Sequence, residues 1–124
     1  PHSPAEKASE RPPSGIAGIE WLGPWLMSLM SRGHINGSRF LDLGSRNAAR
    51  CYGFHVPAGV AEGASADLTL LRPGSRRRVF TKARWNPYHE RPLGWTVAAT
   101  LVAGRLAYLE GTFPGSPRGR EVYP

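Results

Sequence analysis

Apolar residues between positions 19 and 33 recur with the period of an α-helix. They share one helix face at positions i, i+3, i+4, i+7 and i+8, as Leu22, Trp25, Leu26, Leu29 and Met30. Pro24 fits if the helix begins near Ile19, because proline is tolerated in the first turn. Glu20 would then favour the positive end of the helix dipole, and Gly33 would end the helix.

Two shorter helices are predicted after this one. Asn36 can cap the first of them, whose apolar contacts come from Phe40, Leu41 and Leu43. Ser45 is a second capping residue, and it predicts a third helix through "RNAARCY". That helix should end at Gly53, because glycine adopts the left-handed conformation that closes many helices.

Beyond position 53 the pattern takes on the period of β-strands. An apolar run at 68–71 is bounded by turn residues, and "RRVFT" at 77–81 is a further candidate strand. Two runs within "TVAATLVAGRLAYLEG" are separated by Ala103, Gly104 and Arg105, which predicts a hairpin. Residues 1–18 and the tail at 112–124 are rich in turn residues and are predicted to be loops.

Composition is typical of a folded domain with short elements. The chain has 124 residues, of which 40% are hydrophobic and 20% charged, with 15 Gly and 12 Pro. The helices precede the strands, whereas helices and strands alternate in an independent α/β domain. This order favours a segment of something larger.

The net charge of +7 raises the possibility of a nucleic-acid partner. Such a partner needs basic residues clustered on one face, and the tight cluster here is the run from Arg76 to Arg78. We interpret this run as a solvated strand edge that resists pairing. A small basic nucleic-acid-binding protein therefore stays as a less favoured alternative, and we expect no nucleic-acid partner.

The single cysteine, Cys51, cannot form an internal disulfide, which favours a reducing, cytoplasmic setting. No apolar run is long enough to span a membrane, so no membrane partner is expected. Cys51 lies on an apolar helix beside Tyr52, and this position is typical of a buried structural thiol rather than a nucleophile. The four histidines are widely spaced and form no metal-binding motif, so no metal ligand is assigned.

Several motifs resemble those of the dihydroorotases, within the cyclic amidohydrolase superfamily. "PHSPAEK" resembles the second half of the signature Asp-x-Ala-Pro-His-x4-Lys. "PPSGIAGIEWLGPWLMSLMSRGHI" resembles the Gly-Ile-x-Gly-x-Glu stretch and its helix, and "SRNAARCYG" a later helix with Ala48 where proline is usual. "GVAEGASADLTLL" resembles a hallmark shared with hydantoinases and allantoinases, and "WNPYHERPLGWTVAATLVAGRLAYLEG" resembles the closing strands.

The resemblance covers about residues 1–111 and implies an α/β fold. It implies the C-terminal fragment of a (β/α)8 amidohydrolase barrel, represented by its last helices, plus part of a small β-sandwich domain. By this comparison residues 1–53 are the end of the barrel, 54–111 a β-sandwich segment and 112–124 a tail. The barrel segment that would precede them is then the expected partner, and a homo-oligomer is possible.

The resemblance also implies a substrate-binding role for three residues. His2 matches the histidine that binds the carboxylate of dihydroorotate, and an imidazole N–H suits an anion. Ser14 and Gly15 match a loop pair that approaches the pyrimidine ring through backbone groups, although the family often has Phe or another residue at the Ser14 position. Lys7 is expected to hold the loop or face solvent. The signature Asp, a zinc ligand and general base, would lie ahead of Pro1, so no catalytic residue is assigned.

We therefore predict a dihydroorotase-like hydrolase of cyclic amides, which interconverts dihydroorotate and N-carbamoyl-aspartate in pyrimidine biosynthesis. Zinc is the cofactor that the family implies, but this chain by itself is expected neither to hold it nor to be active. The alternatives are a non-catalytic dihydroorotase-like structural subunit and another cyclic amidohydrolase, an allantoinase or hydantoinase. The choice among cyclic amide substrates stays open.

Overall fold

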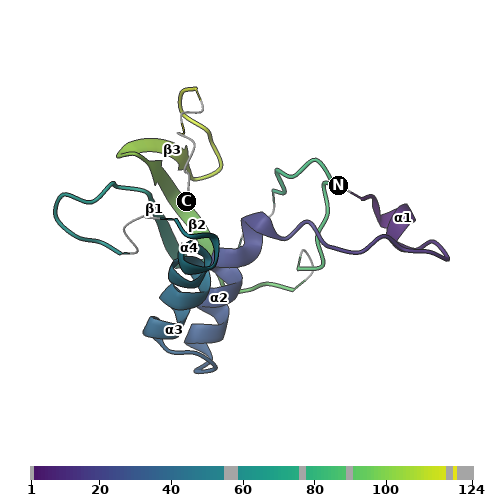
Figure 1. The fold of residues 1–124 in the computed structure, drawn as a ribbon. Helices are drawn as coiled ribbons and strands as arrows, with labels where there is room; N and C mark the ends of the chain where they lie inside the picture. Colours follow the sequence, from purple (N-terminus) through teal and green to yellow (C-terminus); the bar gives the residue numbers. More distant parts are fainter. Residues whose placement is uncertain (1, 55–58, 76–77, 89–90, 117–118, 120–124) are drawn as a thin grey trace.

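The computed structural model describes residues 2–54, 59–75, 78–88, 91–116 and 119 (Figure 1). The order of elements is three groups of helices followed by three strands. Three helices lie together beside the sheet: α2 (Leu22–Ser31), α3 (Gly37–Leu41) and α4 (Asn47–Tyr52). The short helix α1 (Pro4–Lys7) and the loop that follows it project away from this body (Figure 1). The described chain is therefore mixed helix and strand, which agrees with the predicted class at that level.

The predicted amphipathic helix is confirmed. A 3-10 turn, η1 (Ile19–Trp21), leads into α2 (Leu22–Ser31), and Pro24 lies in the first turn of α2 as expected. The chain then leaves the helix at Gly33, whose φ is 75°. No helix in the part of the chain that the structure describes is long and apolar enough to cross a membrane.

The next two predicted helices form one continuous helical run. Asn36 caps α3 (Gly37–Leu41) as predicted, and its Oδ1 accepts a hydrogen bond from the Arg39 backbone N–H at 2.9 Å. The run continues through the π-helical turn η2 (Asp42–Arg46) into α4 (Asn47–Tyr52). The prediction of a new helix capped by Ser45 was wrong, because Ser45 lies inside this run. Gly53 ends it in the left-handed conformation, as predicted.

Three antiparallel strands form a sheet in the order β1-β2-β3: β1 (Leu68–Pro73), β2 (Trp95–Val102) and β3 (Arg105–Leu109). The predicted hairpin is confirmed, since Val102 pairs with Arg105 across a two-residue turn. Both turn residues, Ala103 and Gly104, have positive φ, which is the geometry that favours a right-handed twist between the strands.

Asp67 holds this turn against the start of β1. Its Oδ1 accepts from the Ala103 backbone N–H at 2.7 Å, and the Ala66 carbonyl accepts from the Gly104 N–H at 3.0 Å. The turn's two backbone donors are therefore satisfied by the residues just before β1. This contact sets the tip of the hairpin beside the first strand.

The predicted strand at 77–81 is wrong over 78–81, and its first residue is outside the described ranges. Residues 78–80 have no regular secondary structure and Thr81 lies in a bend. The backbone N–H groups of Phe80 and Thr81 donate instead to the Glu20 carboxylate, at 2.9–3.3 Å. Those are donors that a strand ladder would need, so the side chain of Glu20 replaces a neighbouring strand. Arg78 packs on the Phe80 ring at 4.8 Å rather than at a strand edge, and Arg76 is not among the described residues.

The core lies between α2 and the sheet, where α2 packs on β2 and β1. The buried apolar side chains among the described residues include Trp21, Leu26, Ala99 and Tyr108, with Pro24 beside them at the start of α2. The predicted apolar face of α2 is only partly covered, because Leu22 is 48% exposed and Trp25 37% exposed. Trp95 on β2 ties the end of α2 to the sheet, since its Nε1 donates to the Ser31 hydroxyl at 2.6 Å.

An aromatic cluster lies at β3 and the residues just after it. Phe80, Tyr108 and Phe113 meet edge to face, with ring centroids 5.0–6.1 Å apart. Tyr108 contributes the buried member of this cluster, while Phe113 stays largely exposed. Such pairs stabilise the packing beyond the area they bury, so the cluster attaches the 78–81 segment to β3.

We expect Leu26→Ala to destabilise the protein far more than Leu22→Ala on the same helix. Leu26 is 2% exposed and the backbone of Gly44 passes close to it, so truncation leaves a cavity and costs about 2–5 kcal/mol. Leu22 is half in water, and its truncation costs about 1 kcal/mol or less. Amide hydrogen exchange across residues 22–31 measures the difference. Equal acceleration in the two variants would contradict the packing described here.

A bidentate ion pair joins β1 to the residue after β3. The Arg72 Nε and a terminal guanidinium nitrogen donate to the two carboxylate oxygens of Glu110, at 2.9 and 2.7 Å. The hydrogen bond from Arg72 holds the pKa of the Glu110 carboxyl below its ordinary value of 4.5, and the charge of Arg72 adds to this effect. The pair is exposed on the surface of the sheet.

We expect the Glu110 carboxyl to titrate below about pH 4.5. Because the folded-state pKa is depressed, the contribution of the pair is complete above the ordinary pKa and is lost as the pH falls through the depressed one. A carbon NMR titration of the carboxyl measures the midpoint. Arg72→Gln should return it toward the ordinary value, whereas Arg91→Gln, at another exposed arginine, should not. A midpoint that Arg72→Gln leaves unchanged would refute the assignment.

Candidate functional site

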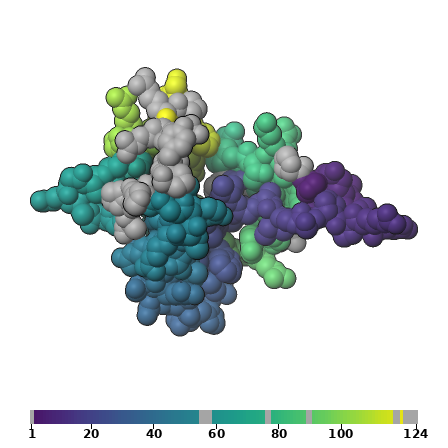
Figure 2. Space-filling model, viewed as in Figure 1, coloured from purple at the N-terminus to yellow at the C-terminus, as the bar shows by residue number. Residues whose placement is uncertain are grey.

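The N-terminal segment, coloured purple, forms an arm that projects from the body of the molecule (Figures 1 and 2), and the three predicted site residues belong to this segment. His2 precedes the short helix α1 (Pro4–Lys7), which Ser3 caps. The Ser3 hydroxyl accepts from the Glu6 backbone N–H at 3.2 Å, and the Glu6 carboxylate accepts from the Ser3 N–H at 2.6 Å. This reciprocal capping box explains how a four-residue helix forms beside a proline-rich loop.

The His2 ring stays accessible on this arm. Its side chain is 47% exposed, and its Nδ1 lies 3.9 Å from a carboxylate oxygen of Glu6. The hydrogen bonds from Ser3, assisted by the nearby charge of His2, lower the pKa of the Glu6 carboxyl. Glu6 is therefore an anion near neutral pH, and its carboxylate lies close to the His2 ring. An exposed imidazole of this kind can donate to an anionic ligand.

Lys7 links α1 to the loop that carries the other two predicted residues. Its ammonium group donates to the backbone carbonyls of Pro13 and Gly15. The expectation that Lys7 holds the loop is thus confirmed. Its two acceptors flank Ser14, so one side chain fixes the backbone on both sides of that residue.

Ser14 and Gly15 are both exposed, and Gly15 has a φ of 81°. This left-handed conformation favours glycine, although the space where a Cβ would stand is open. The structure therefore gives a backbone reason for glycine at this position. It places Ser14 and Gly15 in a loop tied to α1 through Lys7, and it shows no contact from either residue to the His2 ring among the described interactions.

Other candidate chemistry does not converge on this arm. Within the described ranges, no group of three His, Cys, Asp or Glu residues could hold a metal ion. These residues therefore do not fit a zinc site. His34 is exposed on the body, while His55 and His89 lie outside what the structure describes. The expectation of a buried Cys51 was wrong: the thiol is exposed, because α4 turns this face to solvent.

Two residues that sequence reasoning missed support the arm. Trp85 donates from its indole Nε1 to the His2 backbone carbonyl at 2.6 Å, across 83 positions of sequence. Glu20, assigned to a helix dipole, instead anchors the segment that carries Trp85. No local pattern marks either contact, because each depends on how distant segments meet.

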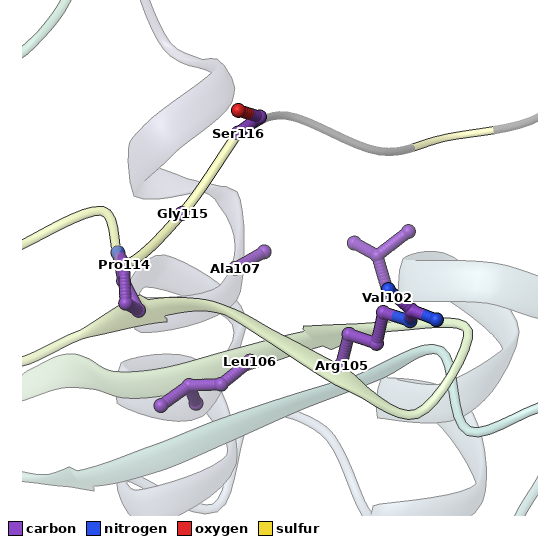
Figure 3. Close-up of a pocket in the computed structure, with 7 residues that line it drawn as sticks. All are labelled: Val102, Arg105, Leu106, Ala107, Pro114, Gly115 and Ser116. Carbon is purple, nitrogen blue, oxygen red and sulfur yellow. The ribbon is translucent and has the colours of Figure 1, made fainter.

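A shallow open pocket of about 240 Å³ lies away from these residues (Figure 3). It is bounded by the β2–β3 hairpin and by residues 114–116, which pass over it, and Arg105 is the charged side chain in its lining. The lining is mostly apolar and lacks a partner for an acid–base step. The predicted site is therefore not this pocket.

Comparison with known proteins shows which enzymes this chain is similar to. No family model matches the chain. Three relatives are 32% identical to it over nearly its whole length: the "Dihydroorotase" of Halobacterium salinarum, covering 98% of this chain, and the "Dihydroorotase" of Sulfolobus acidocaldarius and the "Allantoinase" of Rubrobacter xylanophilus, each covering 100%. Relatives with both names support similarity to the cyclic amidohydrolases.

Within this class the resemblance to dihydroorotases is confirmed. Several relatives of that name match at 31–32% identity, and the matched region is their C-terminal part. The chain spans about 30% of the length of the curated relatives described above. The similarity therefore identifies a region of these proteins, and it extends over both the helices and the sheet.

We expect Lys7→Met to loosen the loop after α1. Methionine keeps the length of the side chain but cannot donate to the carbonyls of Pro13 and Gly15. Cleavage after Glu10 by a glutamyl endopeptidase should accelerate about fivefold, since a lost hydrogen bond of about 1 kcal/mol raises the opened population by that factor. Lys82→Met is the control, at an exposed lysine away from this loop. An unchanged rate in Lys7→Met would show that the ammonium does not secure the loop.

Proposed function

We propose that this chain supplies a substrate-binding arm and part of the scaffold of a dihydroorotase-like cyclic amidohydrolase. The supporting observation is the link that Lys7 makes between α1, beside His2, and the loop of Ser14 and Gly15. It joins the two motifs that resemble the dihydroorotase site into one unit. The similarity of the whole chain to dihydroorotases agrees with this assignment.

In this proposal the substrate is dihydroorotate or its open form, N-carbamoyl-aspartate. A ring N–H of His2 donates to the carboxylate, and the backbone around Ser14 and Gly15 faces the ring of the substrate. Binding and orientation are the roles assigned to these residues. Zinc would activate the attacking water in the complete enzyme, and the residues described here are given no part in holding it. The chain by itself is proposed to bind without turning substrate over.

The proposed architecture divides the chain as the sequence predicted. Residues 1–53 would be the end of an amidohydrolase barrel, 54–111 a segment of a β-sandwich and 112–124 a tail. The half-exposed Leu22 and Trp25 of α2 are consistent with a further contact at that helix face. A cytoplasmic location, a preceding barrel segment as partner, a role in pyrimidine biosynthesis and a homo-oligomeric assembly belong to the same proposal.

Allantoinase activity is the second candidate, because a relative named "Allantoinase" is as similar to the chain as the dihydroorotases are. The chemistry of His2 favours dihydroorotate, since that substrate carries a carboxylate while allantoin and hydantoin carry none. A non-catalytic structural subunit is the third candidate. It predicts folding similar to that of the relatives without ligand binding at His2.

We expect the chain to bind dihydroorotate weakly, with a Kd of about 1 mM or above, and not allantoin. An NMR titration should shift the His2 ring and the amides of Ser14 and Gly15. His2→Ala should abolish these shifts, whereas His34→Ala, at an exposed histidine on the body, should leave them. An assay with added zinc should show no turnover. Turnover near 1 per second would contradict the claim of inactivity, and equal binding of allantoin would contradict the assigned substrate.

A further inference from the structure

A direct hydrogen bond attaches the His2 backbone to the strand-rich half of the chain. The indole Nε1–H of Trp85 donates to the His2 carbonyl at 2.6 Å. The ring of His2 stays half exposed, so the bond fixes the backbone and leaves the imidazole available. Ser3, Glu6 and Lys7 add contacts within the arm itself.

Trp85 is carried by a segment that is itself well anchored. On its N-terminal side, the Glu20 carboxylate binds the backbone N–H groups of Phe80 and Thr81. A turn then follows, in which the Thr81 hydroxyl accepts from the Ala83 N–H at 3.1 Å and the Thr81 carbonyl from the Arg84 N–H at 2.9 Å.

On the C-terminal side of Trp85, the side chain of Asn86 is buried, with 5% exposure. Its Oδ1 accepts from the Tyr88 backbone N–H at 2.8 Å, which closes a second turn. The residue before Trp85, Arg84, adopts a φ of 56°, a conformation that non-glycine residues adopt only where their surroundings enforce it. Trp85 therefore projects from a backbone fixed on both sides.

We propose that Trp85 is a positioning residue for His2, which sets the direction of the imidazole by holding the His2 carbonyl. This inference rests on the proposed function, in which His2 binds a substrate carboxylate. The segment that carries Trp85, anchored by Glu20, then fixes the position of the arm relative to the body. Without the indole N–H, His2 keeps its ring chemistry but samples more directions, so its affinity for an anion falls.

The test replaces Trp85 by Phe, which keeps an aromatic ring but removes the N–H donor together with part of the ring volume. Trp25→Phe is the matched control, because Trp25 is an exposed tryptophan on α2, away from the arm. In the free chain, amide hydrogen exchange and NMR relaxation at His2 and Ser3 should show greater mobility in Trp85→Phe than in Trp25→Phe. Dihydroorotate binding should weaken about fivefold in Trp85→Phe, the loss expected for one hydrogen bond of ordinary strength.

The two readouts separate this inference from the proposed function. Unchanged mobility at His2 in Trp85→Phe overturns the positioning role, whether or not the ligand binds. If the mobility rises and Trp85→Phe binds dihydroorotate as tightly as the unsubstituted chain, the role in recognition is overturned. If the mobility rises and neither protein binds, the proposed function fails and with it the role in recognition, while the mechanical contact is supported.

Discussion

The arrangement of the chain depends on the hydrogen bonds that the Glu20 carboxylate accepts. This carboxylate comes from the turn that opens α2, and it accepts from the backbone of Phe80 and Thr81, about 60 positions later in the sequence. Hydrogen bonds to a charged acceptor contribute about 1.5–3 kcal/mol, and an unmatched backbone donor costs a similar amount. Glu20 thus satisfies donors of an irregular segment and fixes that segment beside the helix.

Several other features depend on this contact. The segment at 78–81 cannot join the sheet while its donors face Glu20, so the described sheet stops at three strands. Phe80 is brought to Tyr108 and Phe113, and the aromatic cluster attaches the segment to β3. Further along, the same segment carries Trp85 to the His2 carbonyl. This one segment therefore contacts the helix, the sheet and the arm.

The elements that sequence patterns predicted are those fixed by neighbours in the chain. The period of apolar residues in α2, the Asn36 cap, the Gly53 stop and the two-residue turn at Ala103 and Gly104 all act within a few positions. The errors have a common physical origin. Ser45 has the side chain of a capping residue, but η2 supplies its helical surroundings, and the strand-like sequence at 77–81 gives way to a carboxylate from a distant turn. Cys51 was misplaced because an apolar helix sequence does not show which face the rest of the fold covers.

The candidate site shows the same division between local and distant determinants. Lys7 lies near enough to Pro13 and Gly15 in sequence for its role as a loop holder to be anticipated, and the φ of Gly15 accounts for the residue type there. The bond from Trp85 could not be anticipated, because it depends on how Glu20 and Asn86 hold the backbone on either side of Trp85. A motif can therefore identify which side chain meets a ligand, while the direction of that side chain depends on backbone contacts made far away. In this protein the accessible imidazole of His2 depends on its near neighbours in sequence. The hydrogen bond to the His2 carbonyl comes from a distant residue of the body, Trp85.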